Sequence, residues 1–457
     1  MSFSATYIDY LHSFSLSCMT QEVLTQAKKT FLDYLGVTVA GCSIASYSQD
    51  NAFFSRIAAE QVCVVGGTEN TDILQAAFLN GFHAHVCELD DGHRFGMLHL
   101  GAPIYSALIS TSAVASLTWD SFFKGAVVGY EAAVKLARLI QPAHKLRGYH
   151  ATGTCGTIGA AMSVCVALDY TPEQMGSALA MAATSAAGLL EVIDGCSQLK
   201  PYNVGRAAMD GLQAALFGSV GLMPPDDVIG GRRGFLKTLA DIQMEEHAFR
   251  RFLSEERPEI LNIYFKPYAA CRHSHPAIET AICLKDQIVD IKQIDSILVE
   301  TYKLAVAGHE HTDIRGVSSA KMSTCYGVAC ALLHGQCDLE NYDVDCLNHV
   351  TASGLIPLVR VQEDPVMTEM SPAVRAARLT ILLKNGESFM CEVDHPKGEP
   401  ENPMTEAEII HKMDRLFRLA GREDARTLAD QILRLENKPS DTIRGTMNKP
   451  PRRDDHD

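Results

Sequence analysis

Apolar residues recur with a helical period along the first half of the chain. After Thr20, which suits an N-cap, they fall three or four positions apart as far as Gly36, where we expect the helix to end. The stretch TPEQ, beginning at Thr171, combines an N-cap threonine with a proline at the first helical position and a glutamine that completes a capping box. Small residues dominate between positions 153 and 190 and would let helices pack closely. We predict that residues 1–265 form a large, mainly α-helical domain.

The pattern changes after residue 265. The stretch DSILVETYKLA is rich in β-branched residues and partly alternating, as a strand would be. In ARLTILLKNGESFMCEV, two apolar runs are joined by Asn385 and Gly386, which predicts a β-hairpin with a type I′ turn. Between these segments, KMSTCYGVACALLHG predicts a helix that ends at Gly335. These elements predict a small α+β domain over residues 266–395.

A helical pattern returns before the C-terminus. Thr405 and Glu408 have the spacing of a capping box, and Ile409, Met413 and Leu416 would line one face of the helix that follows. We expect residues 396–440 to dock back on the helical domain. Residues 441–457 are polar and contain proline, and we expect a loose tail there. The predicted fold class is mainly α, with a large helical domain and a smaller α+β domain.

The charge and cysteine content narrow the function classes. The formal net charge of −15 over 457 residues disfavours nucleic acid and anionic membrane surfaces as partners, because both attract basic proteins. No apolar run reaches the roughly 18 residues of a membrane span, and the first residues do not resemble a signal peptide, so we expect a cytoplasmic protein. The 14 cysteines include no Cys-x-x-Cys pair, which disfavours iron–sulfur and structural zinc sites. We expect reduced thiols.

One short stretch concentrates ionisable residues. HAHVCELDDGHRFGMLHLGAP contains Glu88, Asp90, Asp91, His93 and His99. The two histidines that begin it lie two apart, on different faces of a helix, and the His-Glu-x-x-His motif of zinc enzymes does not occur here. A proton-transfer site needs only a base, an acid and a positive group. The stretch is therefore either such a site or simply a charged helix end followed by a loop.

Other stretches carry further candidates, each of which also has an ordinary structural interpretation. His150 lies between a glycine turn and an alanine-rich helix, where backbone N–H groups suit a carboxylate. Lys200 precedes a helix of small residues that would not bury a charge easily. Near the domain junction, YFKPYAACRHSHPAI and SSAKMSTCYG supply the remaining candidates, which are Lys266, Cys271, Arg272, His273, Ser323 and Tyr326. A buried histidine, an exposed lysine or a core tyrosine would explain each of these singly.

These motifs occur together and in order in a known family. NGFHAHVCELDDGH, GYHATGTCGTIGAA, KPYNVGRAAMDG, KPYAACRHSHPAI, AKMSTCYGVACALLHG and HPKGEPENPMTEAEI resemble the MmgE/PrpD family, which includes 2-methylcitrate dehydratase, cis-aconitate decarboxylase and iminodisuccinate epimerase. The resemblance implies a homodimer of two-domain subunits, with a site between the domains and no metal or organic cofactor. It places family site residues at His99, His150, Lys200, Lys266, Tyr326, Asp90 and Asp91.

The chain also departs from the family pattern. The usual first acid, aspartate, is Glu88, and the threonine that commonly follows the aspartate pair is Gly92. The spacing from Asp91 to His99 is about one residue longer than in decarboxylase-type members, and a histidine of those members falls on Cys271. These differences weigh against cis-aconitate or 2-methylcitrate itself as the substrate.

The function predicted from these residues is a cofactor-independent lyase, most simply a dehydratase of a small, citrate-like hydroxy-polycarboxylate. The alternatives are an epimerase or decarboxylase using the same site, and a catalytically silent protein that binds a carboxylate. His99 and His150 would exchange protons, because imidazole titrates near neutral pH. Lys200, Lys266 and Arg272 would bind carboxylates and meet developing charge. The remaining assignments are Glu88 and Asp91 as orienting acids, Tyr326 as a donor, and Asp90, His93, His273 and Ser323 as substrate contacts.

Overall fold

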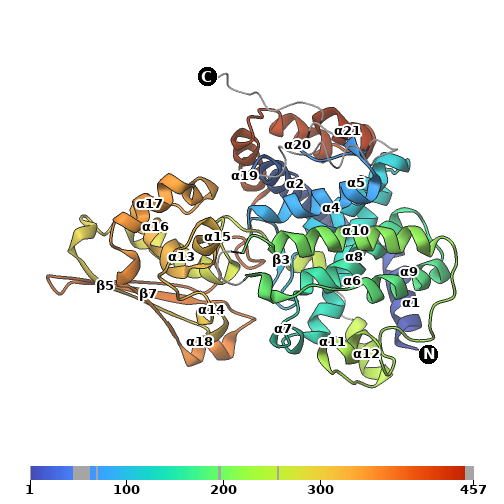
Figure 1. The fold of residues 1–457 in the computed structure, drawn as a ribbon, viewed down its shortest axis with the longest axis horizontal. Helices are drawn as coiled ribbons and strands as arrows, with labels where there is room; N and C mark the ends of the chain where they lie inside the picture. The colour runs from blue at the N-terminus through green and yellow to red at the C-terminus, as the bar shows by residue number, and fades with distance from the viewer. Residues whose placement is uncertain (1, 45–61, 68–69, 194–196, 255–256, 448–457) are drawn as a thin grey trace. The chain divides into compact units, whose positions relative to one another are not determined.

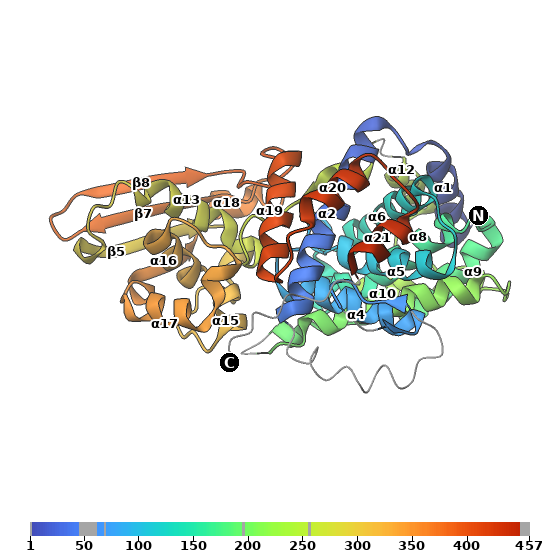
Figure 2. The same ribbon diagram turned by 90° about the horizontal axis from the view of Figure 1, so that it is seen from above.

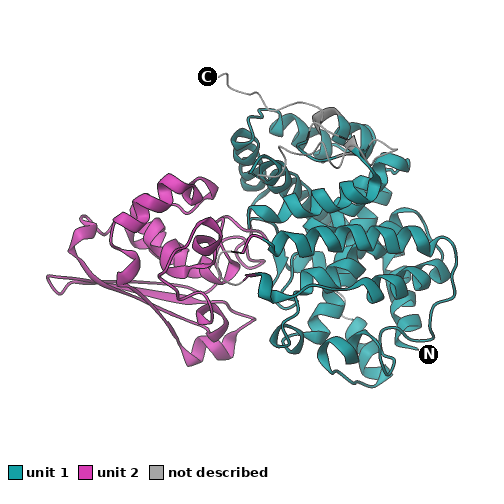
Figure 3. Ribbon diagram, in the orientation of Figure 1, with its two compact units in different colours: residues 1–192, 199–263, 405–457 teal, residues 193–198, 264–404 magenta. Residues whose placement is uncertain are grey.

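The structure, a computed structural model, describes residues 2–44, 62–67, 70–193, 197–254 and 257–447. The chain divides into two compact units. Unit 1 comprises residues 1–192, 199–263 and 405–457, and unit 2 comprises residues 193–198 and 264–404 (Figure 3). The chain thus forms most of unit 1, crosses into unit 2, and returns to unit 1 with its last helices. The described residues are mainly α-helical, as predicted, with one four-stranded mixed sheet and two two-stranded sheets.

Unit 1 is built from helices of small residues around a central one. Helix α8 is buried along nearly its whole length and packs against α5, α6, α9 and α10 (Figure 1). The two capping boxes predicted for this unit, at Thr171 and Thr405, are present. The helices and short strands are α1 (Phe3–Ser17), α2 (Gln21–Ile44), β1 (Val62–Cys63), β2 (Asn70–Thr71), α4 (Ile73–Val86), β3 (Gly92–His93), α5 (Gly101–Val114), α6 (Trp119–Ile140), α7 (Ala143–Leu146), α8 (Ala151–Ala167), α9 (Pro172–Ser185), η2 (Leu190–Ile193), α10 (Lys200–Gly218), α11 (Phe235–Ala240), α12 (Glu246–Leu253), η3 (Glu259–Asn262), β4 (Ile263–Tyr264), α19 (Glu406–Leu419), α20 (Ala425–Leu433) and α21 (Pro439–Met447).

Helix α2 corrects one expectation. It continues through Gly36 to Ile44 rather than ending at the glycine. Gly36 lies where α19 packs against α2, and a Cβ there would approach the Cα of Met413 to 3.2 Å (Figure 2). Gly41 lies against α4, where a Cβ would fall 1.9 Å from the carbonyl oxygen of His83. These glycines therefore permit close helix packing, which outweighs their low helix propensity.

The C-terminal segment differs from the loose tail expected after residue 440. Residues 439–447 form α21, with Pro439 in its first turn and Ile443 buried. The Thr442 hydroxyl donates a hydrogen bond to the Glu436 carbonyl. One buried apolar side chain and this local bond anchor a segment that is otherwise polar. Residues 448–457 lie outside the described residues.

Unit 2 is a four-stranded sheet with helices packed on it. The strand order is β6-β5-β7-β8; β5 and β6 are parallel and the other pairs antiparallel. Helix α13 packs on β7 and β8, and α16 packs on α13 and β6 (Figure 2). The elements are η4 (Arg272–Ser274), α13 (His275–Lys285), η5 (Ile291–Gln293), β5 (Ile294–Thr301), α14 (Lys303–Val306), α15 (Val317–Met322), α16 (Thr324–His334), η6 (Leu339–Tyr342), α17 (Val344–Ala352), η7 (Ile356–Leu358), β6 (Val359–Glu363), α18 (Pro365–Met370), β7 (Ala377–Leu383) and β8 (Ser388–Val393).

The predicted hairpin between β7 and β8 is present, but its turn type is not the one predicted. Gly386 has φ of +89°, while Asn385 is not among the residues with positive φ. The Gly386 N–H bonds the Leu383 carbonyl, and the Leu383 N–H bonds the Glu387 carbonyl. This is a three-residue loop with a left-handed glycine, not the two-residue type I′ turn, which needs positive φ at both positions. Elsewhere, Gly335 ends α16 in the left-handed conformation, as predicted. Among the described residues, no helix is both long and apolar enough to cross a membrane.

Candidate active site

The candidate site is built on the loop that joins α4 to α5. Two of its residues, Glu88 and Met97, have positive φ of 55° and 52°, an uncommon conformation for residues with a side chain. Backbone bonds between His93 and Leu98 close the loop on itself. Lys412, on α19, donates a hydrogen bond to the carbonyl oxygen of Leu89 at 2.7 Å. The strained backbone is thus held by its own bonds and by a C-terminal helix, a pattern common at functional sites.

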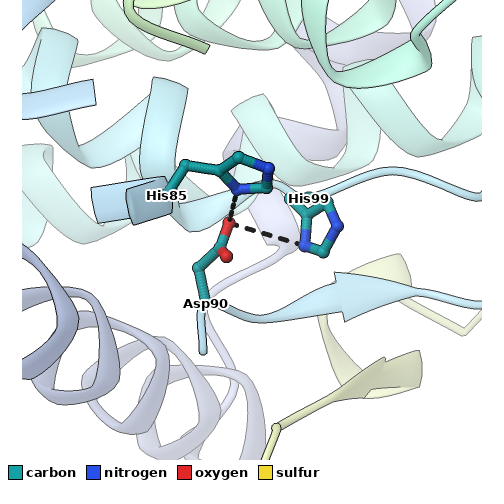
Figure 4. Close-up of side chains that lie close together, drawn as sticks. All are labelled: His85, Asp90 and His99. Atoms are coloured by element: carbon teal, nitrogen blue, oxygen red, sulfur yellow. Dashed lines mark hydrogen bonds and ion pairs between the residues drawn. The ribbon is translucent and has the colours of Figure 1, made fainter. Parts of the chain in front are cut away.

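Asp90 lies between two histidine rings (Figure 4). His85 Nδ1 is 2.8 Å from Asp90 Oδ2, and His99 Nδ1 is 3.4 Å from the same oxygen. His99 Nδ1 is also 2.7 Å from the carbonyl oxygen of Asp91. A carbonyl only accepts hydrogen bonds, so His99 Nδ1 carries a proton. In neutral His99 the lone pair is therefore on Nε2, and this nitrogen is the one that can act as a base.

The same three side chains form a group that could hold a cation. One ligand atom each from His85, Asp90 and His99 lie within 4.8 Å of one another. Both histidines, however, direct an Nδ1–H group at an oxygen that accepts its hydrogen bond. An ion bound at these nitrogens would have to displace both protons. The donor set therefore fits a carboxylate that orients two imidazoles better than it fits a metal centre.

His150 has the opposite tautomer to His99. The side-chain amide of Asn203 lies 3.1 Å from the Leu189 carbonyl and 3.3 Å from His150 Nδ1. Since the Leu189 carbonyl only accepts, the amide nitrogen faces both groups, and it donates to His150 Nδ1. Burial, followed by the charge of Lys200, holds the pKa of His150 well below its usual value. Neutral His150 therefore carries its proton on Nε2 and offers a hydrogen-bond donor there.

Lys200 supplies the positive charge at this cluster. It is the first residue of α10, and its ammonium group forms an ion pair with Glu88, the residue with strained φ. Glu88 Oε1 also lies 3.6 Å from His85 Nε2. The rings of His85 and His99 are 4.8 Å apart, and those of His85 and His150 are 6.2 Å apart. A base, a donor and a cation are thus grouped in unit 1.

Asp91 holds the backbone rather than facing the cluster. Its carboxylate accepts hydrogen bonds from the Gly101 N–H at 2.9 Å, at the start of α5, and from the Tyr130 hydroxyl. Burial raises the pKa of Asp91 to about 7, against the lowering effect of these bonds. Asp91 is thus placed to position His99, as an orienting residue would be, since its backbone carbonyl fixes the tautomer of that ring.

His93, expected to contact substrate, is also buried inside unit 1. Its Nδ1 accepts the Gly96 N–H at 3.1 Å, so the neutral ring carries its proton on Nε2, which lies 3.3 Å from Glu259 Oε2. Burial lowers the pKa of His93, although the hydrogen bond to Glu259 opposes this. His93 therefore stabilises the loop that carries His99.

In unit 2, Arg272 is part of an internal network. It is 3% exposed, and its Nη2 donates to Glu399 Oε1 at 2.9 Å. Another guanidinium nitrogen donates to His275 Nδ1 at 2.9 Å, and the group lies over the ring of Tyr264. These contacts use the guanidinium, so the expected contact between Arg272 and a substrate carboxylate would require breaking them.

Ser323 and Tyr326 are likewise engaged within unit 2. Ser323 caps α16 and donates to the His311 carbonyl at 2.7 Å. The Tyr326 hydroxyl donates to the Asn341 carbonyl at 2.6 Å, and burial raises the pKa of this phenol. Lys266 is 1% exposed. Proton donation from Tyr326 to a substrate would therefore require release of the Asn341 carbonyl.

Cys271 and His309 form a thiol–imidazole pair in unit 2. The sulfur lies 3.7 Å from His309 Nε2, and His309 Nδ1 lies 2.7 Å from the Met322 carbonyl. That carbonyl fixes the proton on Nδ1 and leaves a lone pair on Nε2 toward the thiol. His273, next but one in the chain, bonds the Tyr302 hydroxyl at 2.7 Å.

Sequence reasoning missed several residues of the cluster in unit 1. His85 was set aside because it lies two positions from His83, and the two do sit on different faces of α4; yet His85 is the one that bonds Asp90. Asn203 lies within the motif KPYNVGRAAMDG and Lys412 lies outside the quoted motifs. Neither was a candidate, because an amide and a single lysine become informative only when their partners are known.

Comparison with known proteins agrees with this architecture. The family model of the MmgE/PrpD N-terminal domain matches residues 6–247, and that of the MmgE/PrpD C-terminal domain matches residues 268–437. The chain is 25% identical over 420 residues to cis-aconitate decarboxylase of Aspergillus terreus, covering 86% of this chain and 84% of that protein. It is 23% identical over 442 residues to cis-aconitate decarboxylase of Homo sapiens, covering 90% and 87%. The chain belongs to the MmgE/PrpD family.

Proposed function

We propose that this protein is a lyase that acts on a small polycarboxylate by acid–base chemistry at His99, His150 and Lys200. The observation that carries the proposal is the pair of opposite histidine tautomers, His99 with a lone pair on Nε2 and His150 with a proton on Nε2. An elimination needs both a proton acceptor and a donor to oxygen. Dehydration of a hydroxy-acid is therefore the first candidate reaction.

In this mechanism His99 Nε2 removes a proton from the carbon beside a carboxylate. The electron pair that is released forms the alkene and expels the hydroxyl group, which takes a proton from the Lys200 ammonium and leaves as water. His150 donates a hydrogen bond to the carboxylate oxygen on which charge develops, and the Lys200 ammonium offsets that charge until it gives its proton to the leaving hydroxyl group. Lys200 can do so once substrate takes the place of Glu88 in the ion pair.

Decarboxylation is the second candidate, supported by the named activity of the relatives. Loss of carbon dioxide leaves a carbanion that must be protonated, so it requires a cation and a proton donor but no base for a C–H bond. Lys200 and His150 would suffice for this reaction. The Glu88, Gly92 and Cys271 departures support a substrate other than cis-aconitate.

The test is to incubate the protein with citrate-, aconitate- and aspartate-type acids and follow each by NMR. Formation of an alkene without carbon dioxide supports dehydration, and release of carbon dioxide supports decarboxylation. Inversion of a stereocentre without either product supports epimerisation. Binding without any reaction would refute a lyase. His99→Gln should abolish turnover, whereas His144→Gln, whose ring bonds Thr154 in the same unit, should retain it.

We further propose a homodimer in the cytoplasm, as the family resemblance implies. Helix α10 exposes Tyr202 and Phe217, and such apolar side chains support an interface between copies. Light scattering on the purified protein tests this, and a monomer at all concentrations would contradict it.

A further inference from the structure

The thiol–imidazole pair of Cys271 and His309 in unit 2 takes no part in the mechanism proposed above. Two stretches of sequence meet in it: Cys271 follows the alanine pair of KPYAACRHSH, and His309 begins the stretch HEHTD. The sulfur lies 3.7 Å from His309 Nε2, and the Nδ1–H of that ring bonds the Met322 carbonyl at 2.7 Å. The pair thus consists of a nucleophile, a base beside it and a third group that orients the base.

The junction of α15 and α16 holds both members of the pair. The Cys271 N–H donates to the Lys321 carbonyl at 2.8 Å, and the His309 carbonyl accepts the Thr324 N–H at 2.8 Å. The bond from the His309 ring to the Met322 carbonyl comes from the same junction. Because backbone groups of one short segment fix both residues, the contact between the sulfur and the ring is preorganised.

The two side chains differ in exposure and in what they offer. Cys271 is partly exposed, whereas His309 is 9% exposed. The Met322 carbonyl only accepts, so the neutral His309 ring has its lone pair on Nε2, toward the sulfur. Transfer of the thiol proton to this nitrogen leaves a thiolate, which is the form of cysteine that attacks oxidants. The limited exposure of the sulfur favours a small oxidant over a bulky electrophile.

We propose that Cys271 is an oxidation site at which hydroperoxides convert the thiol to a sulfenic acid, with His309 as the base. His309 Nε2 takes the thiol proton, the sulfur attacks one peroxide oxygen, and the O–O bond breaks. The other oxygen takes the proton from His309 and leaves as water or alcohol, so the sulfur loses two electrons and the peroxide is reduced. A small thiol such as glutathione then forms a mixed disulfide with Cys271 and releases water, and a second such thiol displaces it as a disulfide.

The other ionisable groups near the pair are engaged with partners of their own. The guanidinium of Arg272 is held by the carboxylate of Glu399. His273 Nδ1 lies 2.7 Å from the Tyr302 hydroxyl, and its ring centroid lies 5.5 Å from that of His309. Burial raises the pKa of Tyr302, so this phenol stays neutral. His309 is therefore the imidazole that the geometry assigns to the thiol.

The test uses the full-length reduced protein, hydrogen peroxide and dimedone, which traps sulfenic acids, with peptide mass spectrometry as the readout. We expect dimedone on Cys271 of the wild type at pH 6.5, and its loss when glutathione is added before the trap. His309→Gln should slow trapping at Cys271 by at least about tenfold at pH 6.5, where a thiol without a neighbouring base is only about 1% ionised. At pH 9.5, where most thiols are ionised without help, the wild type and the variant should react at similar rates.

Three results would overturn the proposal. Cys271 that is never trapped in the wild type would exclude the oxidation site. An unchanged rate in His309→Gln at pH 6.5 would exclude His309 as the base. A rate in this variant that stays equally low at pH 9.5 would show that the ring supports the local structure rather than taking the thiol proton.

The chain offers a matched control variant and an internal reference. His311 lies two positions after His309, and its Nε2 lies 3.1 Å from the Ser319 carbonyl, so His311→Gln should leave the rate at Cys271 unchanged. Cys346 is also partly exposed, and its sulfur lies 3.6 Å from a different imidazole, so its trapping should be equal in the wild type and in His309→Gln. Equal slowing in both variants, or at both cysteines, would refute the assignment of the base.

Discussion

Asn203→Asp tests the assignment of the His150 proton. In the wild type the amide donates to His150 Nδ1 and to the Leu189 carbonyl. Aspartate has nearly the same shape but only accepts, so His150 must move its proton to Nδ1 to bond it. The nitrogen that donates to substrate oxygen in the proposed mechanism then carries a lone pair instead.

The expected fall in kcat follows from the hydrogen bond between His150 and the side chain at position 203. To react, the variant must return the proton to Nε2 and break a hydrogen bond to a charged carboxylate, which contributes about 1.5–3 kcal/mol. At about 1.4 kcal/mol per factor of ten, kcat should fall about 10- to 150-fold. The carboxylate should also raise the pKa of His150. Because the imidazolium carries a proton on both nitrogens and again donates from Nε2, the loss of kcat should be smaller at acidic pH.

The assay combines kinetics with ¹⁵N NMR of histidine-labelled protein, which reports directly which ring nitrogen carries the proton. The control is Asn80→Asp, because Asn80 is buried in the same unit and its oxygen already accepts the Val65 N–H. Wild-type His150 protonated on Nδ1, or an Asn203→Asp variant with unchanged kcat and unchanged tautomer, would refute the reasoning.

Three further predictions concern packing, pH and thiol chemistry. Gly41→Ala should lower the free energy of unfolding by at least about 1–3 kcal/mol, because its Cβ would overlap the His83 carbonyl; urea denaturation measures this, and unchanged stability would contradict the close packing. Burial lowers the pKa of His83 to about 3, so the unfolded chain binds a proton here below pH 6.5 and the native protein does not. Through His83, the free energy of unfolding should thus fall by about 2 kcal/mol between pH 7 and pH 5. His83→Gln should lack this part of the fall. If the free energy of unfolding fell equally in the variant and the wild type, the assignment to His83 would be wrong. Cys271 should react with iodoacetamide at mildly acidic pH and lose that reactivity in His309→Gln, as measured by mass spectrometry; an unlabelled Cys271 would exclude the thiol–imidazole pair.

Local signals in the sequence correctly predicted several helix ends. The capping boxes at Thr171 and Thr405 and the left-handed Gly335 act within one turn of helix, and they form as predicted. The sequence was misleading where contacts between residues far apart in the chain determine the structure. Gly36 resembles a helix end but lies inside α2, because α19, from far along the chain, packs against it. The hairpin turn contains the predicted glycine in a different loop type.

In the candidate site, too, some features could be predicted from the sequence and others depend on residues far apart in the chain. The sequence identified the residue types of the cluster, and the structure brings Glu88, His99, His150 and Lys200 close to His85. Their protonation could not be predicted, because it is set by backbone carbonyls and by Asn203, which lies 53 positions from His150. The hydrogen-bond network of Arg272 could not be predicted either, because its partner Glu399 lies 127 positions away.

The most direct test of the account is solvent-proton exchange in metal-stripped protein. The protein would be incubated in deuterated water with hydroxylated and unsaturated polycarboxylates, and each acid followed by NMR. The account predicts deuterium at the carbon beside a carboxylate, or alkene formation, with no added ion, and loss of both in His99→Gln. Activity that returns only when a divalent cation is added would contradict it, and would make His85, Asp90 and His99 ligands rather than an oriented base and its support.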